Sequence, residues 1–169
     1  MARTVRITVK GDYNLKELIK ETNNLDGKRI KVSPQGDRNE FLASIHEYGV
    51  QIRVTDKMRG YLASHGLHLK KSTSFINIPE RSFMRSGWDQ NENTIVDTIV
   101  DMAKGLAAGN TTADDLLNQV GGETAELIKD FAKDLANPKN HPFTIKRKGF
   151  NDPLIDSGKM VGSIDYEIE

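Results

Sequence analysis

Residues 94–135 read TIVDTIVDMAKGLAAGNTTADDLLNQVGGETAELIKDFAKDL, and this stretch decides the fold. Apolar side chains recur every three or four positions on both sides of residues 109–110, which is the spacing of one face of a helix. The pattern predicts a long helix over residues 82–108 and a second over residues 112–135. A threonine opens the second helix and Asp115 follows three positions later, as in a capping box. Because only a few residues join them, we expect the two helices to form an antiparallel hairpin.

A pair of glycines, Gly121-Gly122, interrupts the apolar stripe of the second predicted helix. Glycine lowers stability in a helix interior, so its presence there calls for a structural reason. The pair therefore predicts either a kink or a close approach of another element. The helix is expected to end at Asn137-Pro138, since proline cannot continue it.

Short strands are predicted on either side of this hairpin. Alternation of apolar and polar residues and flanking turn residues identify them as residues 3–9, 28–32, 41–48, 50–54, 74–78 and 163–169. Residues 41–48 fit a helix or a strand, and we interpret them as the partner of residues 50–54 across a tight turn. Short helices are expected over residues 13–23 and 56–65. No regular β-α-β alternation is present, which favours the α+β class, with a mixed or antiparallel sheet packed against the helix hairpin.

The segment after the second long helix, residues 137–160, is predicted to be an extended C-terminal arm, because it is rich in proline, glycine, asparagine and aspartate. Loops longer than about 15 residues are usually functional or disordered. We expect this arm to be poorly ordered in the free monomer and to contact other subunits, with Leu154 and Ile155 filling a neighbour's pocket. Asp156 and Ser157 would then cap backbone amides at the turn. The alternative is that Leu154 and Ile155 pack on the sheet of their own subunit.

The composition limits the classes of function. The chain has 169 residues, with 24 Lys and Arg, 24 Asp and Glu, and no cysteine. A dedicated duplex-DNA binder is usually clearly basic, so zero net charge argues against that class. The absence of cysteine excludes a disulfide framework and a thiolate zinc site. Residues 1–10 lack the apolar core of a signal peptide, and no apolar stretch approaches membrane-spanning length, so no membrane partner is expected.

Patterns that resemble catalytic or metal motifs are incomplete. Residues 157–160 end like a phosphate-binding loop, but the required earlier glycine and following serine or threonine are missing. His46-Glu47 begins like a zinc-protease helix without the second histidine. His65 and His68 are three residues apart but have no third ligand nearby in sequence. We therefore predict no catalytic residue, no metal and no cofactor.

Lys146, Arg147 and Lys148 form a basic triplet between two phenylalanines. A triplet of this kind contacts phosphate or an acidic partner in some proteins and is simply solvated in others. Both interpretations stay open from the sequence.

Arg81, Arg85 and Trp88 form a second candidate contact surface at the start of the first long helix. Arginine and aromatic residues are enriched at interface hot spots, which makes this a candidate interface. The alternative assigns Phe83 and Trp88 to the core and both arginines to surface ion pairs. We expect Phe83 to be buried and Trp88 to be the better interface residue.

Several segments together resemble the virion-morphogenesis family of tailed bacteriophages. Residues 78–86, Ile-Pro-Glu-Arg-Ser-Phe-Met-Arg-Ser, are similar to the proline-arginine-phenylalanine segment that precedes the family's long helix. Residues 46–49, His-Glu-Tyr-Gly, are similar to its aromatic-glycine turn. Residues 137–164 carry Asn-Pro, Thr-Ile, Lys-Gly, Leu-Ile-Asp-Ser-Gly and Ser-Ile in the family's order. The resemblance covers residues 41–169, which we take as the family domain, and residues 1–40 are an N-terminal strand-helix-strand elaboration with no matching motif.

The resemblance implies a structural component of the virion, or of a prophage-derived particle, and no enzyme. Such proteins form a ring, here expected to have sixfold symmetry, at the neck between the head connector and the tail tube, and complete the tail. The implied partners are further copies of the chain, head-completion or connector proteins, and the tail terminator or tail tube, assembled in the bacterial cytoplasm. Genome DNA would pass through the lumen without specific binding. The alternative is a nucleic-acid-binding or DNA-packaging accessory protein that uses residues 146–148.

Overall fold

The computed structural model describes residues 15–169, so the predicted strand over residues 3–9 lies outside the described residues. The elements are α1 (Leu15–Leu25), β1 (Ile30–Pro34), α2 (Asp37–Tyr48), β2 (Val50–Arg53), α3 (Asp56–Ser64), β3 (Phe75–Ile78), α4 (Phe83–Ala107), α5 (Ala113–Asp134), α6 (Pro142–Lys148), α7 (Lys159–Gly162) and β4 (Ile164–Ile168). The α+β class is confirmed, with two small antiparallel sheets, β1-β4 and β2-β3. Within residues 15–169, no helix is both long and apolar enough to cross a membrane.

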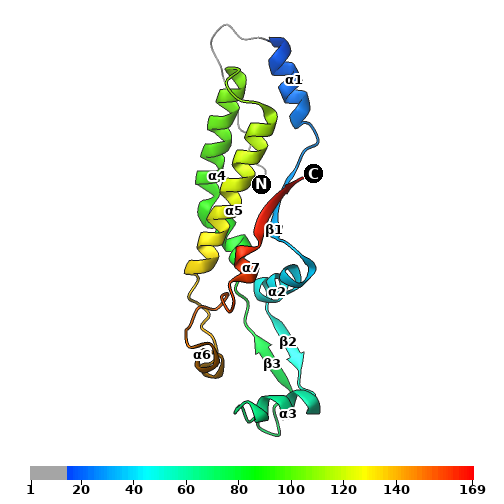
Figure 1. The fold of residues 1–169 in the computed structure, drawn as a ribbon, viewed down its shortest axis with the longest axis vertical. Coiled ribbons are helices and arrows are strands. Elements are labelled where there is room, and N and C mark those ends of the chain that lie inside the picture. Colours follow the sequence, from blue (N-terminus) through cyan, green and yellow to red (C-terminus); the bar gives the residue numbers. More distant parts are fainter. Residues whose placement is uncertain (1–14) are drawn as a thin grey trace.

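The long helix hairpin is confirmed, because α4 and α5 lie side by side along most of their length (Figure 1). The capping box is also present: the Thr112 side chain accepts the Asp115 N–H, and the Asp115 carboxylate accepts the Thr112 N–H. The buried carboxylate of Glu21 on α1 accepts the Ala113 N–H at 2.7 Å. The first backbone amides of α5 are thus satisfied by the neighbouring side chains of the capping box and by Glu21 of α1.

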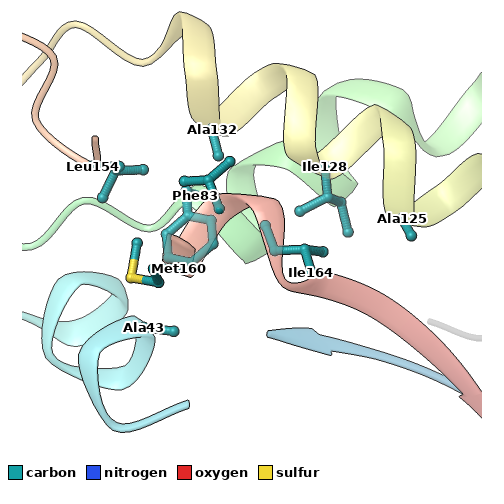
Figure 2. Close-up of a cluster of buried hydrophobic side chains, with 9 residues drawn as sticks. Ala43, Phe83, Ala125, Ile128, Ala132, Leu154, Met160 and Ile164 are labelled. Carbon is teal, nitrogen blue, oxygen red and sulfur yellow. The ribbon is translucent and has the colours of Figure 1, made fainter. Parts of the chain in front are cut away.

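The sheet β1-β4 packs against α5 and joins the two ends of the described chain. Its strands are antiparallel, with Ile30 opposite Ile168 and Pro34 opposite Ile164. Figure 2 shows the main core beside the start of β4, where Phe83 and Ile164 are fully buried. The core cluster consists of Ala43, Phe83, Ala125, Ile128, Ala132, Leu154, Met160, Val161 and Ile164. It therefore combines α2, the α4-α5 hairpin, the C-terminal arm and α7.

The prediction that residues 41–48 form a strand is wrong, because they belong to helix α2. Its buried residues, Ala43 and Glu47, are four apart, which is the spacing of a helical face. The real partner of β2 is β3, with Val50 opposite Ile78. The strand predictions for residues 50–54 and 74–78 are confirmed, but sequence proximity gave the wrong pairing.

The segment β2-α3-β3, residues 50–78, forms a projection that we call the ribbon arm. Figure 1 shows it extending away from the helix hairpin, with α3 at its far end. The end is held by Arg59, whose guanidinium donates to the carbonyls of Lys70 at 2.9 Å and Thr73 at 2.8 Å. The β2-β3 ladder continues through a bond from the Val54 N–H to the Ser74 carbonyl. The ribbon arm is therefore an ordered extension that holds itself together.

The C-terminal arm, residues 137–160, was expected to lack secondary structure, and this is wrong for its middle part. Helix α6 begins with Pro142 in its first turn, and the His141 ring accepts the Phe143 N–H at 3.2 Å. It ends at Gly149, which has a φ of 84° and so closes the helix in the left-handed conformation. These local signals specify one short helix within a segment rich in turn residues.

Gly121 on α5 provides a direct test of the packing between α5 and β4. A Cβ added at Gly121 would lie 2.3 Å from Cδ2 of Tyr166 on β4, so the predicted close approach is confirmed. We expect Gly121→Ala to lower the free energy of unfolding by about 1–3 kcal/mol, because the ring or the strand must move. Gly122→Ala is the matched control, since its Cβ would meet only Cε1 of Tyr166 at 3.7 Å. Thermal unfolding of both variants measures the difference, and equal stabilities would show that the ring moves freely.

Candidate assembly surfaces

Arg81 lies at the junction of the ribbon arm, α4 and the C-terminal arm. Its side chain is 5% exposed, and Nε donates to the Pro138 carbonyl at 2.9 Å. Nη2 donates to Oδ1 of Asn140 at 3.3 Å. Arg81 was predicted as an interface residue, and the structure corrects this. Its guanidinium is buried within its own chain, where it donates hydrogen bonds to acceptor groups of the turn at the start of the C-terminal arm.

His46 on α2 completes this junction. Its Nδ1 lies 3.3 Å from Nη1 of Arg81, which can only donate. Burial, followed by the positive charges of Arg81 and Lys148, lowers the pKa of His46 to about 4. The ring is therefore neutral at neutral pH, and Nδ1 accepts the hydrogen bond from Arg81. The backbone reinforces the contact, since the Arg81 N–H donates to the His46 carbonyl at 2.7 Å.

Arg85 is more exposed than Arg81 but is also engaged within its own chain. Its Nε donates to Oε1 of Glu47 at 2.8 Å, and Nη2 donates to Glu80 at 2.7 Å. The guanidinium also lies over the Tyr48 ring, 5.0 Å from its centroid. The Glu47 carboxylate, which is buried, additionally accepts the backbone N–H groups of Met84 and Arg85. Glu47 therefore caps α4 from another helix and orients Arg85 at the base of the ribbon arm.

The basic triplet lies on α6 and in part lines a cavity of about 460 Å³, which we call the basic pocket. Its charged lining residues are Arg38, Arg147, Lys148, Asp156 and Lys159. Leu154 and Ser157 also line it, so the structure brings together five of the predicted site residues. Lys146 is exposed on α6 and is not part of the lining. Burial lowers the pKa of Lys148, whose Nζ donates to the Asp152 carbonyl at 2.7 Å.

Leu154 does not point toward a neighbour, so the predicted role for it is corrected. Its side chain is 6% exposed and packs in the core cluster of its own chain (Figure 2). This agrees with the alternative, in which the arm positions the final strand. Ile155 is half-buried, and Asp156 and Ser157 are exposed. The tertiary packing thus gives different environments to two adjacent apolar residues for which the sequence predicted the same role.

Trp88 is 44% exposed and lines an apolar depression of about 340 Å³, which we call the α4 groove. The groove is lined by Ile30, Val32, Met84, Arg85, Trp88, Asp89, Thr124 and Ile128. It contains residues of β1 and none of β4, so it lies on the β1 side of the sheet. In the described part of the chain β1 pairs only with β4, and two of its residues, Ile30 and Val32, line this groove.

Sequence reasoning missed the apolar face of the ribbon arm. Val50 pairs with Ile78 and Ile52 with Ile76, so these four side chains share one face of the β2-β3 ribbon. The alternation in residues 50–54 is the available signal, and it predicted a strand but not which surface its apolar face meets. Arg38 and Lys159 of the basic pocket were missed as well, since they lie far apart in sequence.

No group of three or more His, Asp or Glu side chains in residues 15–169 is arranged to hold a metal ion. No family model, curated protein or solved structure matches the chain.

Proposed function

We propose that this protein is a ring-forming structural component of a phage or prophage-derived particle. It acts at the neck, between the head connector and the tail tube, and completes the tail for head joining. The observation that carries the proposal is the ribbon arm, which projects from the body and carries three exposed large apolar side chains, Val50, Tyr61 and Phe75. Exposed apolar surface of this kind usually marks a protein interaction site.

Three features support this proposal beside the sequence resemblance. The ribbon arm and the α4 groove are separate surfaces, as head-to-tail contacts in a ring require. The arm has an ordered base and end, so little conformational entropy is lost when it binds. Zero net charge suits a lumen through which DNA passes, because a strongly basic channel retains the genome.

The basic pocket favours a second candidate, a nucleic-acid-binding accessory protein. Arg38, Arg147, Lys148 and Lys159 concentrate positive charge around one cavity. Fluorescence anisotropy with duplex DNA at physiological salt separates the two candidates. The ring proposal expects weak, sequence-independent binding, whereas submicromolar affinity that falls steeply with salt would favour the accessory protein.

The ring proposal is tested by particle assembly in a lysogen that carries the gene. An early stop codon should yield separate heads and tails in electron micrographs, because the neck is incomplete. Expression of the protein in trans should restore joined particles, and antibody labelling should place it at the neck. Normal infectious particles from the stop-codon lysogen would contradict the proposal.

A further inference from the structure

We propose that the ribbon arm of one copy binds the α4 groove of the next copy, with one arm strand added to the edge of β1 that has no strand partner within residues 15–169. This inference rests on the proposed ring and names the contact that builds it. The occupant of the groove is therefore a second copy of this chain.

The ribbon arm supplies an apolar face that matches such a site. Val50, Ile52, Ile76 and Ile78 lie together on this face; Val50 is exposed and the other three are half-buried. Neither β2 nor β3 packs extensively against another helix or strand in the described part of the chain. An isolated two-stranded ribbon is only marginally stable in water, so burial of this face would stabilise the arm itself.

The α4 groove supplies the complementary surface. Trp88, Met84 and Val32 provide apolar walls, and Ile128 on α5 also lines the groove. Within residues 15–169 the β1 edge away from β4 has no strand partner, so its backbone groups can pair with a further strand. Tryptophan is strongly enriched at interface hot spots, which agrees with its exposure here.

One geometry uses both features at once. On β1, Ile30 and Val32 point into the groove. A ribbon strand that pairs with β1 extends the sheet by one strand. The apolar face of the ribbon then lies in line with Ile30 and Val32 and covers α4. The backbone pairing fixes the register, and the apolar side chains supply the contact with Trp88.

Charge selects the groove of another copy over a symmetric arm-to-arm contact. The ribbon arm, residues 50–78, carries five Lys and Arg against one Asp, a net charge of +4. Residues 83–134, which form the helix hairpin, carry four Lys and Arg against ten Asp and Glu, a net charge of −6. Two arms would repel each other, whereas an arm and a hairpin attract. Asp89 lines the groove, and Asp89 and Glu92 form no ion pair within residues 15–169.

The proposed contact joins two different surfaces, the ribbon arm of one copy and the α4 groove of another. In Figure 1 the ribbon arm points away from the helix hairpin, so it does not fold back onto its own α4 groove. A head-to-tail contact of this kind leaves one free arm and one free groove on every dimer. Repetition of the contact closes into a ring when the rotation between copies permits it.

Two variants test the pairing by complementation. Ile52→Asp with Ile76→Asp damages the arm and leaves the groove intact, whereas Trp88→Arg damages the groove and leaves the arm intact. Each variant alone should be monomeric in sedimentation velocity under conditions where the wild type assembles. An equimolar mixture should form a one-to-one heterodimer and no larger ring, because a single intact arm and a single intact groove remain. Phe150→Asp, an exposed apolar position elsewhere, is the matched control and should assemble like the wild type.

A charge exchange gives a second test with exposed side chains only, so folding is not at risk. Asp89→Lys with Glu92→Lys should weaken self-association by about tenfold or more, and so should Lys70→Glu with Lys71→Glu. Combining the two exchanges in one chain should recover most of the lost association. Far-UV circular dichroism of each variant confirms the fold.

The outcomes separate this contact from the ring proposal itself. If the wild type forms rings and all of these variants form them equally well, the contact is wrong and the ring proposal stands. If the mixed variants form no heterodimer although each is folded, the arm and the groove are not partners. If the wild type stays monomeric and particles assemble without it, both the contact and the ring proposal fail.

Discussion

Replacing Leu154 by Ser should lower the free energy of unfolding by about 4 kcal/mol. The side chain is 6% exposed and packs with Phe83 and Met160 in the core cluster. The substitution leaves a cavity and buries a hydroxyl group among apolar side chains that offer it no hydrogen bond. Both effects destabilise the folded chain. Urea or thermal unfolding of the purified protein measures the loss.

Ile155→Ser is the matched control, because Ile155 is half-buried at the adjacent position. We expect its cost to be about 1 kcal/mol, in keeping with partial burial. A folded Leu154→Ser monomer that fails only to enter particles would contradict the core assignment. It would restore the original expectation that Leu154 fills a neighbour's pocket.

Replacing Glu47 by Ala should cost about 3 kcal/mol, because the carboxylate satisfies three donors at once. It accepts the N–H groups of Met84 and Arg85 at the start of α4 and pairs with the Arg85 guanidinium at 2.8 Å. The N-cap residue of α4, Ser82, makes no side-chain capping bond, so nothing nearby replaces Glu47. Unfolding measurements should show the loss, and hydrogen exchange should show faster opening of the first turn of α4.

Glu80→Ala is the control for this prediction. Glu80 also pairs with Arg85, at 2.7 Å, but both side chains are about half exposed. Exposed ion pairs contribute roughly 0–1 kcal/mol, so this variant should be nearly as stable as the wild type. Equal losses for Glu47→Ala and Glu80→Ala would mean that charge neutralisation of Arg85, and not the capping of α4, is the important interaction.

The Glu47 junction also links stability to the proposed assembly. Glu47 and Arg81 hold the base of the ribbon arm, α4 and the C-terminal arm in one arrangement. In the proposed assembly, a rigid base would let the contact made by β2 and β3 set the angle between neighbouring copies. Variants at the junction should therefore affect ring formation through folding, whereas Trp88→Arg should affect it without a loss of stability.

Elements with local signals are predictable from the sequence alone. The apolar periodicity of residues 82–108 and 112–135 gave both long helices, and the Thr112–Asp115 capping box gave the start of α5. Alternation gave β2, β3 and β4, and Gly121 indicated a close approach. These features depend on residues within a few positions of one another, so the spacing of those residues is enough to predict them.

Features that depend on distant partners are visible only in the folded chain. Residues 41–48 are ambiguous by pattern, and they form a helix that brings Glu47 to the amide of Arg85, 38 positions away. Arg81 is buried because the carbonyl of Pro138, 57 positions away, receives its guanidinium. Leu154 and Ile155 have the same local context, yet the core cluster accommodates only Leu154. Burial and strand pairing are set by which surfaces meet in the folded chain, and no short stretch of sequence contains that information.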